Sequence, residues 1–271
     1  MSKHVRAIVV SGNGVNCEKE MALACHLGGA EEVDIVHVAD LLAGKVRLED
    51  YHFLNFPGGF LDGDDLGSAK AGVNRWRHAG GGHLFEQLRA FVDSGKLVLG
   101  VCNGFQLLVK LGFLPALDGA YGEQRASLTF NDGGRFEDRW CWLKADPESP
   151  CVFTRGLERL YLPVRHGEGK FVTDSPETFE RIQKLHLGAL TYCRPESNEP
   201  TMDYPFNPNG SLGAIAGICD ASGRVFGLMP HPEAYLWREH HPRWTRGEKL
   251  PGEGMGVWLF RNAVSYLRAR L

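Results

Sequence analysis

The chain of 271 residues is 43% hydrophobic and 23% charged, with a formal net charge of −3 and a pI of about 6.4. These values are typical of a globular protein with a substantial core, and the lack of a long lysine and arginine run disfavours nucleic-acid binding. No apolar stretch reaches the roughly 18 residues that a membrane span needs, and the N-terminus has no signal-peptide pattern. We therefore expect neither nucleic acid nor membrane as a partner.

The seven cysteines are spread irregularly and include no Cys-x-x-Cys pair. This spacing disfavours zinc knuckles and thioredoxin-like sites, and it favours reduced thiols in the cytoplasm. We expect six of the cysteines to be small buried hydrophobic side chains. Cys102 is the exception, because of the turn on which it lies.

Short apolar runs alternate with helical patterns in the first part of the chain, which predicts an α/β fold with an open, mainly parallel sheet and helices on both faces. The expected strands are 6–10, 33–38, 53–56 and 97–101. The expected helices are 18–27, 82–94 and a stretch that begins after the turn at Cys102.

Beyond about residue 120, glycine, aromatic and charged residues mix. We expect shorter strands and long loops there, for example in 136–143 and 161–172. Two later strands, 214–219 and 225–229, are joined by Asp220-Ala221-Ser222-Gly223, which predicts a hairpin.

The last stretch, 254–271, has the pattern of an amphipathic helix. No repeat or linker interrupts the chain. We predict one domain over 1–271, with surface insertions near 170–200 and 237–253.

The loop that follows the first strand, 11–17, places Gly12 and Gly14 where a dinucleotide-binding fingerprint begins. Cys17 stands in place of the third glycine, and Asp40 is only a loose match to the acidic residue that such a unit needs. A flavodoxin-like nucleotide-binding module is therefore a weaker alternative.

Seven residues, Gly100-Val101-Cys102-Asn103-Gly104-Phe105-Gln106, separate a strand pattern from a helix pattern and put a cysteine at the apex of the turn. The flanking glycines leave room for the chain to fold back. A nucleophile on such a turn has a strained backbone and lies near a helix N-terminus, which favours thiolate. The pattern is that of a nucleophile elbow, with cysteine in place of serine.

The position of His231 in the sequence predicts that it is the base for Cys102. His231 follows the apolar run 225–229, and we expect it at the same sheet edge as Cys102, because functional groups collect at the carboxyl ends of parallel strands. Glu233 is two residues further on, and Pro232 favours an extended backbone in which both side chains point the same way. Glu233 then accepts a hydrogen bond from the His231 ring.

Acyl transfer also needs donors for an oxyanion. The amide of Asn103, directly after the nucleophile, is one predicted donor. The loop Pro57-Gly58-Gly59-Phe60 ends another strand at this edge, and we expect Gly58 and Gly59 to complete the oxyanion hole.

The elbow with its distant His-x-Glu resembles the class I (triad) glutamine amidotransferases, which have a flavodoxin-like fold. Within this superfamily, the chain is most similar to the glutaminase subunits of phosphoribosylformylglycinamidine synthases, because it has several further segments typical of them. They are, in chain order, Pro57-Gly58-Gly59-Phe60, Leu114-Pro115, Asn131 with Arg135-Phe136, His166-Gly167-Glu168-Gly169, Asn207-Pro208-Asn209-Gly210-Ser211 and Gly227-Leu228-Met229-Pro230-His231-Pro232-Glu233. The likeness covers about residues 5–235.

The resemblance implies a glutaminase reaction. Cys102 would attack the side-chain amide of glutamine and release ammonia, with His231 as proton carrier and Glu233 as its orienting group. Water would then hydrolyse the glutamyl thioester. Gln106 and the His166-Gly167 loop would help to hold glutamine.

The resemblance also implies partners. Ammonia would pass through a channel to a separate synthetase subunit, which uses ATP and magnesium to make formylglycinamidine ribonucleotide in purine biosynthesis. A small third subunit often joins the complex. Because the ATP chemistry would lie on the synthetase, we expect no cofactor and no metal in this chain.

Some features depart from the family pattern. Gly133-Gly134 stands where a serine is typical, and Ala234 where an arginine often follows His-Pro-Glu. The segment 237–253 extends beyond the compact pattern, and we expect a surface loop against the partner. Its His240-His241 pair is weak evidence for a metal site.

Two alternatives remain besides the nucleotide module. One is a cysteine hydrolase of the same architecture that acts on peptides or another amide, for which the elbow would serve equally well. The other is a scaffold that kept the fold and lost turnover. The specific segments disfavour the first, and the intact Cys102, His231 and Glu233 disfavour the second.

Overall fold

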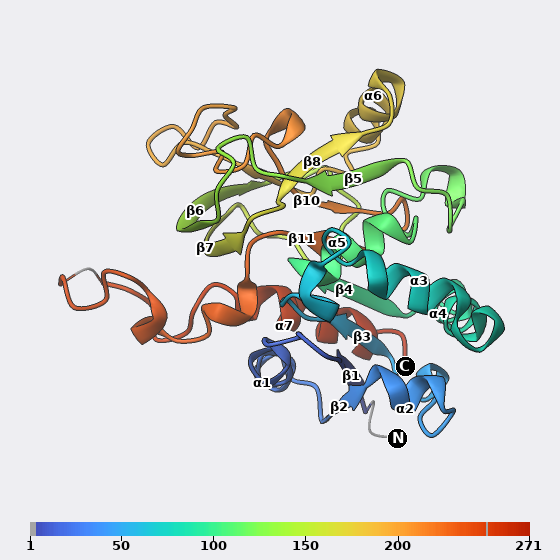
Figure 1. Ribbon diagram of the computed structural model, residues 1–271. Coiled ribbons are helices and arrows are strands. Elements are labelled where there is room, and N and C mark those ends of the chain that lie inside the picture. The colour runs from blue at the N-terminus through green and yellow to red at the C-terminus, as the bar shows by residue number, and fades with distance from the viewer. Residues whose placement is uncertain (1–3, 248) are drawn as a thin grey trace.

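The computed structural model describes residues 4–247 and 249–271, and its central feature is a nine-stranded sheet in the order β2-β1-β3-β4-β11-β10-β9-β6-β7 (Figure 1). A second sheet pairs β5 with β8. The strands are β1 (Arg6–Ser11), β2 (Glu32–His37), β3 (Phe53–Phe56), β4 (Leu97–Val101), β5 (Ala126–Thr129), β6 (Glu137–Ala145), β7 (Arg159–His166), β8 (Lys170–Thr173), β9 (Leu190–Tyr192), β10 (Ile215–Cys219) and β11 (Val225–Leu228). The helices are α1 (Glu18–Gly28), α2 (Val38–Leu42), α3 (Lys70–His78), α4 (His83–Asp93), α5 (Asn103–Lys110), α6 (Pro176–Lys184) and α7 (Val257–Arg268).

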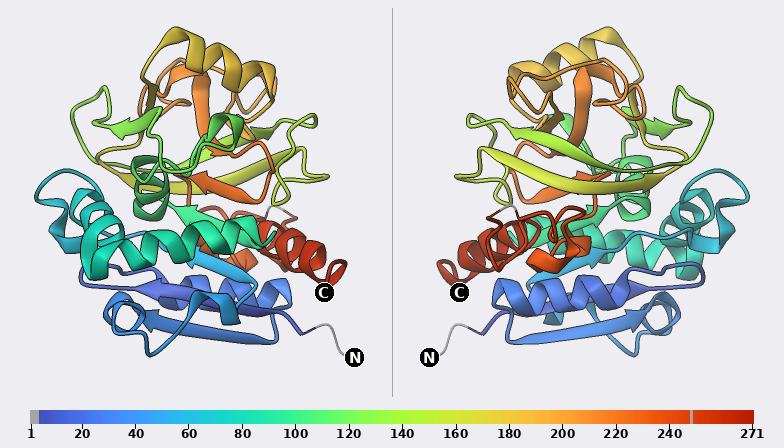
Figure 2. Two further views of the ribbon diagram at one scale, coloured as in Figure 1. Left: turned by 90° about the vertical axis from the view of Figure 1, so that its right-hand side faces the viewer. Right: turned by 90° about the vertical axis from the view of Figure 1, so that its left-hand side faces the viewer.

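The strands β2, β1, β3, β4 and β11 form a parallel half of the sheet. The register pairs Phe56 of β3 and Gly227 of β11 with Gly100 of β4, so these three carboxyl ends are nearly level. Helices α1 and α7 lie on one face of the parallel half, and α3, α4 and α5 lie on the other (Figures 1 and 2). The predicted parallel sheet with helices on both faces is confirmed.

Two close approaches require glycine. A Cβ on Gly28 of α1 would lie 2.7 Å from the backbone of Phe260 in α7, so these helices pack backbone to backbone. A Cβ on Gly104 of α5 would lie 2.0 Å from the carbonyl oxygen of Phe56. The second contact brings the start of α5 against the end of β3, next to the elbow.

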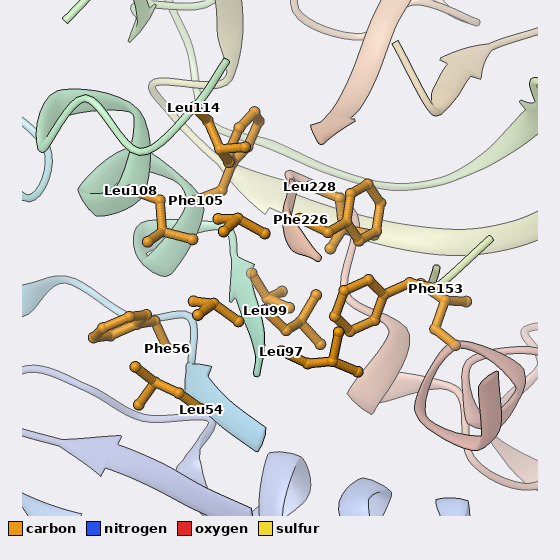
Figure 3. Packing of buried hydrophobic residues seen from close by; sticks show 14 of the residues in the cluster. Leu54, Phe56, Leu97, Leu99, Phe105, Leu108, Leu114, Phe153, Phe226 and Leu228 are labelled. Atoms are coloured by element: carbon orange, nitrogen blue, oxygen red, sulfur yellow. The ribbon is translucent and has the colours of Figure 1, made fainter. Parts of the chain in front are cut away.

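The core surrounds β4, which is buried along its whole length (Figure 3). Leu97 and Leu99 lie beside Phe226 of β11, and the ring of Phe226 stacks on Phe153 with centroids 5.5 Å apart. Phe105 of α5 packs on the other side of β11, where a Cβ on Gly227 would lie 2.1 Å from its ring. The elbow is therefore held between two rigid, buried elements.

The strands β10, β9, β6 and β7 extend the sheet with antiparallel pairing, and the hairpin between β10 and β11 is confirmed. The expectation of shorter strands is wrong here, since β6 has nine residues and β7 eight. Cys141, Leu143 and Ala145 of β6 alternate inward, but Trp140 and Trp142 occupy half-exposed outward positions and hide the alternation in the sequence.

The two predicted insertions have different structures. Segment 170–200 contains β8, α6 and β9. Segment 237–253 is a loop whose ends are joined by a bridge between Trp237 and Glu253, and it projects away from the sheet (orange-red in Figure 1). Residue 248 lies outside the described residues. That the chain is one domain with these surface insertions stays a prediction.

Candidate active site

Cys102 lies at the turn between β4 and α5 and has the strained backbone expected of an elbow. Its φ is 51° and its ψ is −105°. A Cβ on Gly100 would lie 2.6 Å from the carbonyl oxygen of Gly104, so the glycine two residues before the cysteine lies directly against the one two residues after it. The predicted nucleophile elbow is present, and its glycines are sterically required.

The thiol of Cys102 is only 5% exposed but lines a cavity of about 160 Å³. Its Sγ donates a weak hydrogen bond to the carbonyl oxygen of Arg165, at 3.6 Å. The amide of Cys102 donates to the carbonyl of Leu228 at 2.8 Å, which ties the elbow to the end of β11. The sulfur is thus shielded from bulk solvent but not packed away from space for a substrate.

His231 and Glu233 form a buried pair just after β11. The ring Nδ1 lies 2.6 Å from Oε1 of Glu233, and the side chains are 3% and 1% exposed. The amide of His231 donates to the carbonyl of Pro163 in β7 at 2.8 Å. The predicted hydrogen bond between histidine and glutamate is present, and it directs Nε2 away from Glu233.

The surroundings favour the protonated imidazole. Burial lowers the pKa of His231, but the charges of Glu233 and Cys102 and the nearby thiols of Cys102 and Cys17 raise it to a value well above the ordinary one. Neither thiol makes a well-aligned hydrogen bond to Nε2, which has no partner among the described residues. This nitrogen is therefore available for proton transfer.

Gly58 lies between His231 and Cys102. A Cβ at this position would be 2.6 Å from Cε1 of His231 and 3.4 Å from Cβ of Cys102. The imidazole and the thiol therefore meet at the loop that ends β3, as predicted from their positions after parallel strands. No side chain larger than hydrogen fits there without moving the base.

The predicted oxyanion donors surround the same point. Gly59 has a φ of 144°, lines the cavity and bridges to Val15. Asn103 is the first residue of α5, and its side-chain oxygen accepts a hydrogen bond from the amide of Leu61 at 3.1 Å. This bond fixes the loop of Gly58 and Gly59 relative to the helix N-terminus, where oriented amides stabilise an anion.

The three predicted glutamine-binding residues, Gln106, His166 and Gly167, all line the cavity. Nε2 of Gln106 donates to the carbonyl oxygen of Glu168 at 2.6 Å, and its Oε1 accepts from Asn103 at 2.9 Å. Burial, reinforced by the charge of His231, lowers the pKa of His166 to about 3, so this ring is neutral.

The remaining cavity wall comes from residues to which sequence reasoning gave no role: Phe60, Asp64, Ser68, Phe130, Phe136, Arg165 and Glu168. The carboxylate of Glu168 accepts from the amide of Ser68 at 3.2 and 3.3 Å, which links the loop after β7 to the one before α3. Phe60, Phe136 and Glu168 carried a sequence signal, as parts of the Pro-Gly-Gly-Phe, Arg-Phe and His-Gly-Glu-Gly segments.

The Asn-Pro-Asn-Gly-Ser segment supports the His166-Gly167 loop from behind. Asn209 donates to the carbonyl of Gly169 at 2.9 Å, and the hydroxyl of Ser211 donates to the same oxygen at 3.2 Å. Asn131 donates to the carbonyl of His166 at 2.8 Å. These motif residues therefore act by positioning the loop.

The glycine loop 11–17 packs against the loop after β3. The amide of Phe60 donates to the carbonyl of Gly14 at 2.8 Å, and the amide of Asn16 donates to that of Gly58 at 3.3 Å. These contacts give the loop glycines a packing role and give no support to the nucleotide-binding alternative. They also bring Cys17 beside His231, where burial raises the pKa of its thiol despite the opposing effect of the imidazole.

The His240-His241 pair shows no sign of a metal site. The ring of His240 accepts from the amide of Leu236 at 3.3 Å, and the ring of His241 lies against Trp140 at 5.9 Å between centroids. Across residues 4–247 and 249–271, the group that has metal-ligand spacing is instead Cys17, His231 and Glu233. None of the described helices has the length and apolar character needed to cross a membrane.

Comparison with known proteins decides the family. The sequence matches the profile of the CobB/CobQ-like glutamine amidotransferase domain over residues 4–267. The phosphoribosylformylglycinamidine synthase subunit PurQ of Methanococcus maripaludis (strain C7 / ATCC BAA-1331) is 43% identical, over 96% of this chain and 97% of its own. That of Dehalococcoides mccartyi is 44% identical over 99% of both chains. This chain belongs to the PurQ family of glutamine amidotransferases.

The fold of the PurQ family is shared with solved structures. A chain in the structure of PurLQS from Thermotoga maritima is similar with a TM-score of 0.68 and 28% identity, covering 97% of this chain and 99% of that one. A glutamine amidotransferase from the same organism has a TM-score of 0.53 at 16% identity and shows the fold alone. The family and enzyme class predicted from the elbow and the PurQ-like segments are confirmed.

Proposed function

We propose that this chain is the glutaminase subunit of phosphoribosylformylglycinamidine synthase, which hydrolyses L-glutamine to glutamate and ammonia. The observation that carries the proposal is Cys102 on a strained elbow, facing a cavity and meeting the buried His231–Glu233 pair at Gly58. Membership of the PurQ family supports the same reaction.

In the first half of the reaction, the thiol proton of Cys102 passes to His231, and Sγ bonds to the side-chain amide carbon of glutamine. The oxyanion is stabilised by the amide of Asn103 at the helix N-terminus and by those of Gly58 and Gly59. The carbon–nitrogen bond then breaks, and His231 gives a proton to the departing ammonia.

In the second half, water attacks the glutamyl thioester and His231 accepts its proton. The carbon–sulfur bond breaks, and His231 returns the proton to Sγ, which releases glutamate and regenerates Cys102. Glu233 holds the ring through Nδ1 and stabilises its positive charge in both halves. Gln106 and the His166-Gly167 loop hold the substrate.

The partners follow from the same proposal. Ammonia is consumed by a synthetase subunit, which carries ATP and magnesium and makes formylglycinamidine ribonucleotide in the cytoplasm. A small third subunit completes the assembly, in line with the PurLQS composition named for the Thermotoga maritima structure. No cofactor is assigned to this chain.

The decisive experiment is Cys102→Ala in the reconstituted complex. We expect glutamine-dependent synthesis to be lost, while synthesis from added ammonium ions continues at the wild-type rate, because ammonia bypasses the thioester. Cys141→Ala, a buried cysteine of β6, is the control and should keep both activities. Glutamine-dependent synthesis that survives in Cys102→Ala would refute the mechanism.

A further inference from the structure

We propose that Arg135, Arg139 and Tyr204 form a binding point for an aspartate or glutamate side chain of the synthetase subunit. Nη2 of Arg135 lies 2.7 Å from the phenol oxygen of Tyr204, and Nη2 of Arg139 lies 2.6 Å from the same atom. Both guanidinium groups also lie against the ring, with Cζ 5.5 and 4.8 Å from its centroid. We call these three residues the arginine clamp, and the proposed reaction assigns a role to none of them.

The buried carboxylate of Glu137 holds the two arginines in this arrangement. Nε of Arg135 lies 3.1 Å from its Oε1, and Nε of Arg139 lies 2.7 Å from its Oε2. Glu137 is 2% exposed, whereas Arg135 is 61% and Arg139 29% exposed. A carboxylate buried to this degree needs paired cations. Both guanidinium groups are therefore oriented before any ligand arrives, and their outer N–H groups converge on one point.

The clamp has more positive charge than the chain neutralises. Its two guanidinium groups share the single carboxylate of Glu137, and the oxygen on which they converge belongs to a phenol. Asp203, beside Tyr204, is paired with Arg194 instead. The hydroxyl of Tyr204 accepts from both arginines, and its own hydrogen has no acceptor among the described residues. Converging guanidinium N–H groups beside a free hydroxyl donor are suited to bind a carboxylate.

The surroundings of the clamp fit a protein surface. Phe136, between Arg135 and Glu137 in the sequence, is 51% exposed, and Phe60 and Phe130 are 46% and 69% exposed. These three rings line the cavity of Cys102, and those of Phe60 and Phe136 lie 6.3 Å apart between centroids. Exposed aromatic rings next to arginine are typical of the centre of a protein interface.

The partner that covers this mouth is the subunit that receives ammonia, so the choice of the synthetase rests on the function proposed above. Its complementary surface presents one carboxylate with apolar side chains around it. The carboxylate accepts from the hydroxyl of Tyr204 and from outer N–H groups of the arginines, while the apolar side chains cover the exposed phenylalanines.

The test measures association and not turnover. Arg135→Gln, Arg139→Gln and Tyr204→Phe are each introduced into Cys102→Ala protein, and sedimentation with glutamine present gives the Kd for the synthetase with its small third subunit. We expect each arginine substitution to raise Kd at least about tenfold and to weaken its dependence on salt, because a charge is lost from the contact. Tyr204→Phe removes one hydroxyl group and should raise Kd about fivefold.

Two matched controls should keep the Kd. Arg181→Gln removes an exposed arginine that pairs with Asp118, and Tyr266→Phe removes the hydroxyl of a tyrosine that has Arg270 over its ring. Urea unfolding of each variant checks the fold, and Tyr204→Phe keeps the test valid if an arginine substitution unfolds the chain, because its ring is retained.

Clamp variants that assemble with an unchanged Kd overturn the proposal. A raised KM for glutamine in such variants would assign the clamp to a free carboxylate instead. The glutaminase mechanism is judged separately, because a wild-type complex that forms without hydrolysing glutamine would refute that mechanism and leave the comparison of Kd values standing.

Discussion

The strained backbone of Cys102 determines where its sulfur lies. A non-glycine residue with positive φ costs on the order of 1–3 kcal/mol, and it persists only where the surroundings impose it. Here the buried strand β4 and the helix α5 impose it from both sides, through the contact of Gly100 with Gly104. The strain therefore holds the sulfur at the cavity wall, and the residue needs no flexible loop to reach its substrate.

The buried pair after β11 predicts a ranking of variants. His231→Ala removes the group that moves the proton and should lower kcat for glutamine by at least about 10²-fold. Glu233→Ala should lower kcat less, because the ring remains but loses its orienting partner at 2.6 Å. Glu233→Gln keeps an oxygen that accepts from Nδ1–H and should lose less still.

Steady-state glutaminase rates of the three variants check this ranking, with alkylation of Cys102 by iodoacetamide as a control for an intact elbow. A loss for Glu233→Ala that equals or exceeds the loss for His231→Ala would show that the roles are assigned wrongly.

The residues of the proposed catalytic triad could be picked out from the sequence because each carries its signal locally. The elbow is one short segment with required glycines, and His231 and Glu233 are two residues apart at the end of an apolar run. The position of Cys17 beside them was not predictable. It depends on the packing of the glycine loop against Gly58, a contact between segments far apart in the chain.

The loop after β7 is held in place by hydrogen bonds from the segment Asn207-Pro208-Asn209-Gly210-Ser211. Asn209 is fully buried, and its amide holds the carbonyl of Gly169 at the base of the His166-Gly167 loop. We predict that Asn209→Ala raises KM for glutamine about tenfold, equivalent to about 1.4 kcal/mol, with a smaller change in kcat. The loop binds substrate in this proposal and takes no part in bond breaking.

Asn207→Ala is the matched control. Asn207 is equally buried, but the hydrogen bonds of its side chain go to Gly210, Ser211 and the sulfur of Met202 and not to the His166-Gly167 loop. Both variants should lose stability in urea unfolding, and only Asn209→Ala should show the full rise in KM. A rise of equal size in both would mean that the segment supports the fold in general and not the loop.

The elements missed from the sequence have specific causes. α6 has clear start signals, Ser175 as N-cap and Pro176 in its first turn, but it lies in a stretch read as an insertion. α3 follows Ala69 in a left-handed conformation and has no side-chain cap, so nothing marks its start. β9 has only three residues, and its place between β10 and β6 is set by pairing across distant segments.

At the scale of the molecule, the site lies where the two halves of the sheet meet. The parallel half supplies Cys102, His231 and Glu233. The end of β7 in the antiparallel half supplies His166, and the loop after it supplies Gly167. The parallel half follows from alternating strand and helix patterns. The antiparallel extension does not, because its pairings are long-range. His166 and Gly167 on the far wall of the cavity were predicted from the family resemblance and not from the pattern of strands and helices.

The burial of His166 at this junction predicts how the free energy of unfolding depends on pH. His166 is buried at the end of β7, and its pKa is about 3 in the folded protein against an ordinary value of 6.5. Below pH 6.5 the unfolded chain binds a proton that the folded chain excludes, so stability falls as pH falls toward 3 and this loss is complete below 3. Between pH 7 and 4.5 the effect amounts to about 2.5 kcal/mol.

Urea unfolding of wild type and His166→Asn at pH 7 and 4.5 measures this contribution. The compared quantity is the change in the free energy of unfolding between the two pH values, so any cost of the substitution that does not depend on pH cancels. His166→Asn should lose about 2.5 kcal/mol less than wild type on acidification. His186→Asn is the control of opposite sign. Its hydrogen bond to Asp146 raises the pKa of His186, so its contribution is present below 6.5 and is lost as pH rises. Equal acid losses in wild type and His166→Asn would show that His166 takes up its proton in the folded protein.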